Sequence, residues 1–241
     1  MLITGGATGI GANLVEAFAR QGARVGFIDI AEEEGRALAE HLAPEVAHRP
    51  FFAKADIRHI DQLRSAISSA AEATAGVSVL VNNAARDDRH DLETVTPEYW
   101  DENQAVNLRH HFFAAQAVLP YMRAAGGGSI VTFSSIAFML NMGELPAYAT
   151  AKAAIIGLTK SLAGRLGPEN IRVNAILPGM VLTERQRRLW IDEAAIASML
   201  EQQCLKRALV PEDMVGPCLF LASSASAGMT AQSIVVDGGV L

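Results

Sequence analysis

The sequence has few of the features that stabilise secreted proteins or anchor proteins in membranes. Its two cysteines, Cys204 and Cys218, are too few for a disulfide framework in a chain of 241 residues. The longest apolar candidate, residues 130–140, is broken by Thr132 and two serines, so no run reaches the ~18 residues that a transmembrane helix needs. No basic stretch precedes a hydrophobic segment at the N-terminus, as a signal peptide would require. We therefore expect a soluble, cytoplasmic protein with no membrane partner.

Basic residues are also scarce. The chain has 20 Lys and Arg against 26 Asp and Glu, so it lacks the positive surface typical of a protein that binds nucleic acid. Hydrophobic residues make up 50% of the chain, which is too many for a disordered protein with a net charge of only −6. A core of this size needs no metal to stabilise it. We predict no metal site, because His110 and His111 are adjacent on a helix and should point apart.

Short apolar segments alternate with helical segments along the whole chain. The predicted strands are residues 1–4, 24–30, 51–55, 77–81, 129–134, 171–177 and 233–236. The predicted helices are residues 13–20, 31–42, 59–74, 97–124, 147–166 and 211–222, with Thr96 as an N-cap. This alternation predicts an α/β Rossmann fold, a doubly wound parallel sheet of about seven strands with helices on both faces. No repeat or linker divides the chain, which favours a single domain over residues 1–241.

A glycine-rich turn, T-G-G-A-T-G-I-G at residues 4–11, separates the first strand from the first helix. Such glycines let the backbone approach a pyrophosphate, while the helix N-terminus offers free N–H groups and a positive dipole end. A simple glycine-rich turn is the alternative, but the strand before it and the helix after it favour dinucleotide binding. The residues predicted to contact the cofactor here are Gly5, Thr8, Gly9 and Ile10.

Asp29 ends the second strand, 18 residues after Gly11. A carboxylate at this place accepts hydrogen bonds from the adenosine ribose diol and repels a 2′-phosphate. No Lys or Arg occurs in residues 4–11 to offset that repulsion. We therefore predict NAD rather than NADP as the cofactor, against the alternative that Asp29 is an ordinary solvated carboxylate.

Tyr148 and Lys152 lie four residues apart in a helical segment, so both project from one face. A nearby ammonium group and a cationic nicotinamide would lower the pKa of a tyrosine from about 10 and make it a useful base. An amphipathic helix with an extended lysine is the alternative for these two residues alone. Ser135 favours catalysis, because it lies where the fifth strand should end, at the ligand-binding edge of such sheets.

The chain resembles the short-chain dehydrogenase/reductase family over essentially its whole length. The matching positions are Thr4-Gly5-x-x-x-Gly9-x-Gly11, Asp56, Asn82-Asn83-Ala84, Asn107, Ser135, Tyr148, Lys152 and Pro178-Gly179-x-x-x-Thr183. One departure is Ala85, where the family usually has glycine. Family members are often tetramers, and the apolar residues 217–222 and 234–236 suit a subunit interface in a homotetramer.

The resemblance implies a role for each matching residue. Tyr148 would be the general acid/base, Lys152 would lower its pKa and hold the nicotinamide ribose, and Ser135 would bind the reacting oxygen. Asn107 would anchor a water molecule in a proton relay. Further cofactor contacts would come from Asp56 and Ile57 beside the adenine, Asn83 beside the adenosine, and Pro178, Gly179, Val181 and Thr183 at the carboxamide.

Several shorter segments resemble bacterial NAD-dependent aldose 1-dehydrogenases. They are R-D-D-R-H at residues 86–90, residues 99–101, 106–110 and 183–186, Trp190, and residues 203–206. This likeness implies oxidation of a monosaccharide of the galactose, fucose, arabinose, xylose or rhamnose type at C1 to the aldonolactone. Residues 182–200 would form the substrate loop. The candidate sugar contacts are Ser135, Asn141, Glu144, Tyr148, Arg185 and Gln186.

Other interpretations remain open at this point. Residues 86–90 are equally well explained as a charged surface loop, and Trp190 as a residue that packs a lid. The apolar Phe138, Met139 and Met142 keep a steroid or other hydrophobic alcohol open as the substrate. Asp29 counts against reduction of a 3-oxoacyl thioester, which usually takes NADP. A Rossmann protein that binds without turnover is disfavoured, because the three residues expected to carry catalysis are all present.

Overall fold

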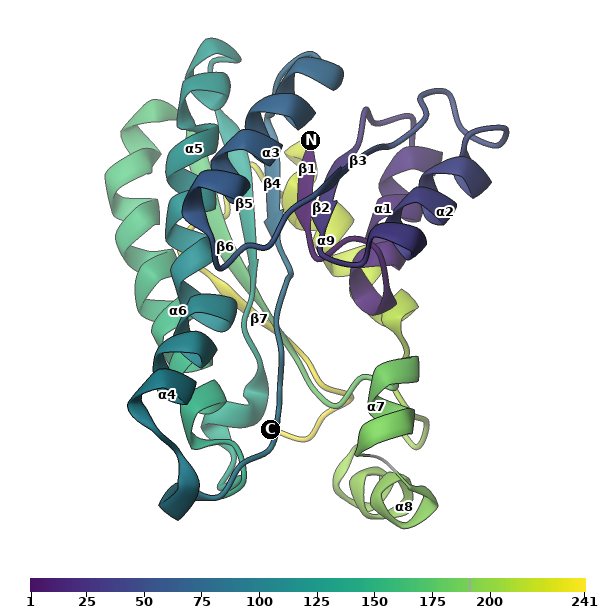
Figure 1. Ribbon diagram of the computed structural model, residues 1–241, viewed down its shortest axis with the longest axis vertical. Coiled ribbons are helices and arrows are strands. Elements are labelled where there is room, and N and C mark those ends of the chain that lie inside the picture. The colour runs from purple at the N-terminus through teal and green to yellow at the C-terminus, as the bar shows by residue number, and fades with distance from the viewer. Residues whose placement is uncertain (191) are drawn as a thin grey trace.

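The computed structural model describes residues 1–190 and 192–241 and has one seven-stranded parallel sheet at its centre (Figure 1). The strand order is β3-β2-β1-β4-β5-β6-β7. The strands are β1 (Leu2–Thr4), β2 (Gly26–Asp29), β3 (Phe51–Lys54), β4 (Val79–Asn82), β5 (Gly128–Phe133), β6 (Ile171–Pro178) and β7 (Ser233–Val236). The predicted doubly wound α/β fold is confirmed. The order reverses between β1 and β4, which is where ligands bind in sheets of this kind.

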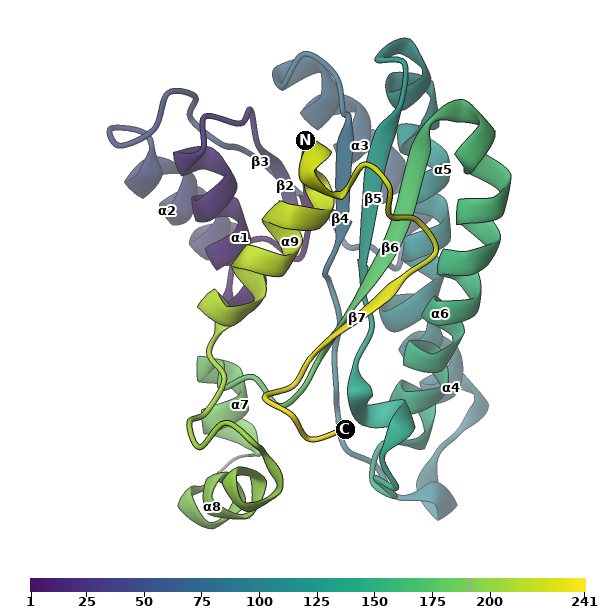
Figure 2. The same cartoon turned by 180° about the vertical axis from the view of Figure 1, so that it is seen from behind.

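Helices cover both faces of the sheet, as the views from the front and from behind show (Figures 1 and 2). α1 (Gly9–Arg20), α2 (Glu32–Leu42) and α9 (Val215–Ala222) pack on one face, and α3 (Ile60–Ala73), α5 (His110–Ala124) and α6 (Pro146–Leu166) on the other. Each face has its own cluster of buried apolar side chains. The strands read as continuous apolar runs because both of their faces are buried.

The helix predicted over residues 97–124 is not continuous. α4 (Pro97–Gln104) begins after Thr96, whose hydroxyl accepts a hydrogen bond from the Tyr99 N–H at 3.2 Å. A π-helical turn, Ala105–Arg109, then precedes α5. Turns of this kind are frequent at functional sites, and this one contains Asn107.

The segment predicted as a substrate loop, residues 182–200, is largely helical. α7 (Glu184–Leu189) begins at Thr183, whose hydroxyl accepts a hydrogen bond from the Gln186 N–H at 3.2 Å. α8 (Glu193–Gln202) begins at Asp192, whose carboxylate caps the Ala195 N–H at 2.8 Å. Both helices lie below the carboxyl ends of the strands in Figure 1. Ile191, between them, lies outside the described residues.

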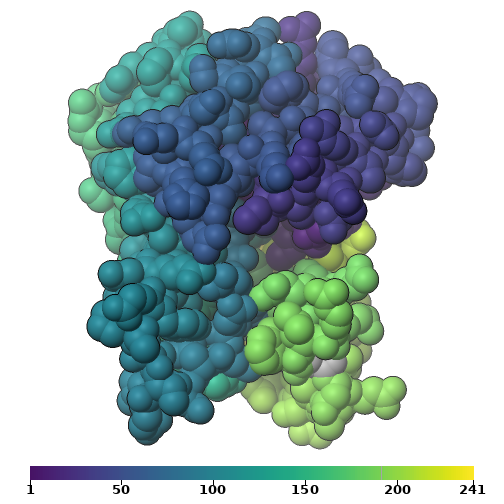
Figure 3. Space-filling model, in the orientation of Figure 1, coloured from purple at the N-terminus to yellow at the C-terminus, as the bar shows by residue number. Residues whose placement is uncertain are grey.

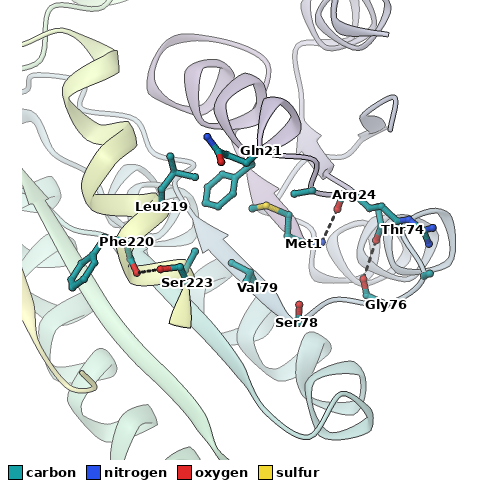
Figure 4. A pocket seen from close by; sticks show the side chains of 14 residues that line it. Met1, Gln21, Arg24, Thr74, Gly76, Ser78, Val79, Leu219, Phe220 and Ser223 are labelled. Atoms are coloured by element: carbon teal, nitrogen blue, oxygen red, sulfur yellow. Dashed lines mark hydrogen bonds between the residues drawn. The ribbon is translucent and has the colours of Figure 1, made fainter. Parts of the chain in front are cut away.

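A cavity of about 700 Å³ opens at the opposite end of the sheet, beside the first residues of β1 and β4 (Figure 4). Met1, Arg24, Val79 and Phe220 are among its lining residues, and the amino group of Met1 donates to the Arg24 carbonyl at 2.8 Å. This cavity is remote from the glycine turn and from every residue predicted to act in catalysis. No helix in the described part of the chain is both long and apolar enough to cross a bilayer.

Candidate active site

The backbone of the glycine turn leaves little room for side chains. Gly5 and Gly9 have φ values of 67° and 55°, which glycine adopts without strain. A Cβ atom on Gly11 would lie 1.7 Å from the Gly5 carbonyl oxygen. Thr8, the N-cap of α1, makes no side-chain hydrogen bond to the first helical turn. The turn therefore keeps backbone space and N–H groups for a ligand, which fits the pyrophosphate of a dinucleotide.

Asp29 connects the end of β2 to this turn. One carboxylate oxygen accepts a hydrogen bond from the Ala7 N–H at 2.9 Å, and the other accepts one from the Ala31 N–H at 3.0 Å. Each oxygen retains a lone pair, so the carboxylate can still accept hydrogen bonds from a ribose diol. Thr8 is exposed and Ile10 half-buried at the other side of the turn.

Asn83 joins the carboxyl end of β4 to the same turn. Its side-chain amide donates to the Gly5 carbonyl at 2.8 Å and to the Thr4 carbonyl at 3.2 Å. The structure thus brings Asn83 beside Gly5, in the turn predicted to approach the cofactor. Its side-chain N–H groups are used in holding the turn in shape.

Asp56 follows β3 and is paired with a cation. The Arg58 guanidinium donates to its carboxylate at 2.6 Å and, with this side-chain hydrogen bond as the largest cause, lowers the pKa of Asp56. Arg58 also pairs with Glu102 at 2.7 Å. Ile57 is half-buried and packs against the core under α3 and α5. A contact of Asp56 with adenine would therefore have to coexist with the Arg58 ion pair.

The residues after β6 enclose the other side of the turn. Gly179, which follows Pro178, donates its N–H to the Val236 carbonyl at 2.9 Å, and a Cβ there would lie 2.8 Å from the Asp237 Cα. Val181 is buried and pairs with Leu209. A Cβ on Gly9 would lie 3.4 Å from the Thr183 methyl group, so Thr183 faces the glycine turn.

Lys152 is buried beside the Tyr148 ring. It is 1% exposed, and its ammonium group donates to the Phe133 carbonyl at 2.9 Å. Its Nζ lies 5.4 Å from the centroid of the Tyr148 ring. Burial lowers the pKa of Lys152 to about 7, because desolvation disfavours the charged form.

Without a cofactor, the groups of the protein raise the pKa of Tyr148, whereas the lowered value was predicted for a site that also holds a cationic nicotinamide. Burial is the main cause that raises its pKa, and the negative charge of Asp87 raises it further. A hydrogen bond with Ser135 lowers it, and no contribution from Lys152 is resolved. The lowering of the Tyr148 pKa by Lys152 together with a cationic nicotinamide therefore stays a prediction for the complex with the cofactor.

Asn107 holds the segment that follows β4. It is fully buried, its side-chain amide donates to the Arg86 carbonyl at 3.0 Å, and its side-chain carbonyl accepts from the Arg86 N–H at 2.8 Å. The π-helical turn places this side chain where it can pair with both backbone groups of one residue. Asn107 thus fixes the start of residues 86–90 beside the catalytic residues.

The prediction that the adjacent histidines point apart is wrong. The ring centroids of His110 and His111 are 4.3 Å apart, and both side chains are fully buried. Burial lowers the pKa of His110 to about 3, so the ring is neutral, and its Nε2 lies 3.1 Å from the Ala84 carbonyl oxygen. Within the described residues, no group of three His, Cys, Asp or Glu side chains could hold a metal ion.

Residues 86–90 form contacts across the cleft and are not a free surface loop. Arg185 of α7 pairs with Asp88 at 2.8 Å, and the Gln186 side-chain amide donates to the Asp87 carboxylate. The Arg89 guanidinium lies 4.9 Å from the Trp190 ring centroid. Figure 3 shows the result: the green α7 and α8 segment lies beside the blue and teal residues that follow β4. Trp190 therefore packs at the mouth of the site.

The other two predicted sugar contacts lie on the segment between Ser135 and α6. Asn141 and Glu144 are both exposed. The Glu144 carboxylate is 3.8 Å from Arg89, and its backbone carbonyl accepts from the His90 N–H at 3.0 Å. Glu144 thus joins the cluster at the mouth of the site. Asn141 is close to that cluster only in the sequence.

Comparisons with known proteins agree with this arrangement. Residues 5–241 match a family model described as "Enoyl-(Acyl carrier protein) reductase", which covers nearly the whole chain. The chain belongs to the short-chain dehydrogenase/reductase family. Enzymes of this family are oxidoreductases that use a nicotinamide cofactor, so the predicted class of enzyme is confirmed.

Individual relatives cover the chain almost completely. It is 65% identical over 240 residues to "Probable galactose dehydrogenase GalD" of Rhizobium meliloti (strain 1021), covering 100% of this chain and 94% of the relative. It is 44% identical over 239 residues to "D-xylose 1-dehydrogenase" of Caulobacter vibrioides (strain NA1000 / CB15N), covering 99% and 94%. The crystal structure of a short-chain type dehydrogenase/reductase from Mycobacterium marinum matches with a TM-score of 0.91 at 32% identity, covering 99% and 94%. These likenesses agree with the predicted resemblance to sugar dehydrogenases.

Sequence reasoning did not single out Asp87 as a residue of the site. Its carboxylate contacts Gln186, 99 positions along the chain, and its charge acts on both Tyr148 and Lys152. The available signal was the position of two consecutive acids, which begin five residues after a strand that ends at the ligand-binding edge.

Proposed function

We propose that this protein is an NAD-dependent aldose 1-dehydrogenase, which oxidises a neutral monosaccharide at C1 to the aldonolactone. The observation that carries the proposal is the placement of Ser135, Tyr148 and Lys152 beside a polar mouth built from residues 86–90 and α7. The names of the two sugar dehydrogenases above support the substrate class. Galactose is the first sugar to test, because the relative with 65% identity is named for it.

The residues of this chain divide the chemistry among them. A nicotinamide held by these residues would supply the hydride acceptor for C1. Tyr148, as the phenolate, removes the proton of the anomeric hydroxyl group, and Ser135 holds that oxygen by hydrogen bonding. Lys152, in its charged form, would stabilise the phenolate beside it. We place the nicotinamide ribose near Lys152, the carboxamide near Thr183, and a relay water near Asn107.

The cofactor preference depends on Asp29 in this proposal. Asp29→Ala removes the carboxylate that would repel a 2′-phosphate, so we expect the ratio of kcat/KM for NAD to that for NADP to fall by about 10-fold or more. Steady-state kinetics with both cofactors at saturating sugar measure this ratio. Glu33→Ala, which removes an exposed carboxylate on α2, is the control. Unchanged kinetics for both cofactors in Asp29→Ala would contradict the assignment.

A hydrophobic alcohol or ketone, of the steroid or 3-oxoacyl type, is the second candidate substrate. Met139 is 51% exposed just after Ser135, which leaves apolar surface near the reacting group. A panel of galactose, fucose, arabinose, xylose and rhamnose, with a hydroxysteroid, separates the two by the rate of NAD reduction. We expect reduction with at least one sugar and little with the steroid; the reverse would favour the second candidate.

We also propose a cytoplasmic homotetramer. Phe220 on α9 and Val235 on β7 are 39% and 41% exposed, and both belong to the apolar C-terminal segments predicted to meet another subunit. Burial of such side chains between subunits would remove this apolar surface from water. Light scattering of the purified protein gives the mass directly.

A further inference from the structure

Two consecutive aspartates follow β4, and their surroundings differ. Asp88 contacts Arg86 and pairs with Arg185 at 2.8 Å, so two guanidinium groups offset its charge. Across residues 1–190 and 192–241, no Lys, Arg or His side chain comes within 4.0 Å of the Asp87 carboxylate. Asp87 therefore forms no ion pair at contact distance within these residues, unlike Asp88.

The arginines nearest in sequence to Asp87 have other partners. Arg86 is 3.2 Å from Glu102 in addition to its contact with Asp88. Arg89 lies over the Trp190 ring and 3.8 Å from Glu144. The partner that Asp87 does have is a neutral amide, because Gln186 donates from Nε2 to its Oδ2 atom.

The charge of Asp87 is directed toward the catalytic residues. It raises the pKa of Tyr148 and opposes the lowering of the pKa of Lys152. The other groups that face Tyr148 are Ser135 and, on its own helix, Lys152; the other groups that face Lys152 are the two buried histidines. The geometry agrees with this placement: Asn107 holds both backbone groups of Arg86, the residue before Asp87, and Gln186 of α7 holds the Asp87 carboxylate. The carboxylate therefore lies between the segment that follows β4 and α7.

We propose that Asp87 is a specificity-determining residue, which accepts hydrogen bonds from hydroxyl groups of a neutral sugar and disfavours sugars that carry a carboxylate. This inference rests on the proposed function of the same site. A half-buried carboxylate needs hydrogen-bond donors, and a polyol supplies several without adding charge. An anionic substrate would instead place two like charges together in a cleft of low dielectric.

Gln186 acts as a positioning residue for Asp87. Its amide occupies Oδ2, which leaves Oδ1 for the sugar. Because Gln186 belongs to α7, this contact also connects the orientation of the carboxylate to the position of that helix over the site.

Kinetics of Asp87→Asn with galactose and its monodeoxy derivatives test the proposal. Asn has the same size and its side-chain carbonyl can still accept the Gln186 hydrogen bond, but it offers a donor where Asp87 offered an acceptor. We expect kcat/KM for galactose to fall by about 10- to 100-fold, the effect of losing a hydrogen bond to a charged group. The fall should disappear with the deoxy sugar that lacks the contacted hydroxyl group, while the KM for NAD stays unchanged.

Two matched controls separate this role from a structural one. Asp88→Asn changes the neighbouring carboxylate, whose partners are arginines, and should affect galactose and every deoxy sugar by the same factor. Asp87→Ala removes the acceptor entirely and gives a second measurement if the Asn variant unfolds. Both variants are checked by thermal melting.

Two further readouts address the charge of Asp87. Wild-type enzyme should prefer galactose to galacturonate, and Asp87→Asn should narrow that preference by about 10-fold or more, because the repulsion is gone. The acidic limb of the kcat profile should also move to lower pH in Asp87→Asn, because the charge that raises the pKa of Tyr148 is removed.

The outcomes distinguish this inference from the proposed function. If wild-type enzyme oxidises galactose but Asp87→Asn loses the same factor with every deoxy sugar, or loses nothing, the inference is overturned and the proposed function stands. If wild-type enzyme oxidises no aldose, the proposed function fails first, and the inference fails with it.

Discussion

Tyr148→Phe is expected to lower kcat for sugar oxidation by about 10²- to 10⁴-fold, the range typical for loss of a general base. The phenyl ring keeps the shape of the side chain, so KM values for sugar and NAD should change little. In the wild-type complex with NAD, the positive charge of the nicotinamide would lower the Tyr148 pKa, so kcat should rise with pH as Tyr148 ionises. This limb should be absent from the variant. Steady-state kinetics between pH 6 and pH 10 measure both effects.

Tyr121 provides a matched control for this substitution. It lies on α5, is partly buried against the core between α3 and α5, and is remote from Ser135 and Lys152. Tyr121→Phe should keep the wild-type kcat and the wild-type pH profile. A Tyr148→Phe enzyme that turns over as fast as the Tyr121→Phe control would contradict the assignment of Tyr148 as the base.

Lys152→Met is expected to reduce activity and to stabilise the fold at the same time. Lys152 has a pKa of about 7 in the folded chain against 10.5 for an ordinary lysine. Between these values the unfolded chain binds more protons than the folded chain, so the free energy of unfolding of the wild type rises with pH over this window. Methionine cannot bear a charge, and its burial avoids the cost that Lys152 incurs below pH 7.

The expected size follows from the same shift. The pKa falls from 10.5 to about 7, and at about 1.4 kcal/mol per unit this corresponds to about 5 kcal/mol at pH 6. The lost hydrogen bond to Phe133 subtracts about 1 kcal/mol, so Lys152→Met should be about 4 kcal/mol more stable than the wild type at pH 6. The difference should shrink as the pH rises toward 10. The kcat/KM for sugar should fall by about 10²-fold or more. Urea denaturation at several pH values, together with kinetics, measures both.

Lys160→Met is the control on the same helix. Lys160 is exposed, so its replacement should change neither the free energy of unfolding at any pH nor the activity. A Lys152→Met variant that is less stable than wild type at pH 6, or whose difference from wild type does not depend on pH, would contradict the account of a desolvated lysine.

The sheet could be predicted from the sequence because its signals are local. Apolar runs such as residues 171–177 are strands buried on both faces, and the glycine turn needs only the residues that form it. The pairing of Tyr148 with Lys152 followed from a spacing of four in one helix. Each of these predictions depends on residues that are neighbours in the chain.

The features of the site that could not be predicted depend on tertiary packing, which cannot be read from the sequence. The π-helical turn at Asn107 inserts one residue into a segment whose composition is typical of an ordinary helix. The contact of Asp87 with Gln186 joins residues 99 positions apart. The raised pKa of Tyr148 comes mainly from burial, which exists only once the fold has formed. The lower pKa expected in the complex with the cofactor therefore stays a prediction.

The fate of the hydrogen at C1 tests the central proposal most directly. Galactose deuterated at C1 is incubated with enzyme and NAD, and the reduced cofactor and the sugar product are analysed by mass spectrometry and NMR. Hydride transfer from C1 predicts that the deuterium appears in the reduced nicotinamide and that the first product is the deuterium-free galactonolactone. Reduced cofactor without deuterium, with the label retained in the sugar product, would show that another carbon is oxidised and would contradict the proposed function.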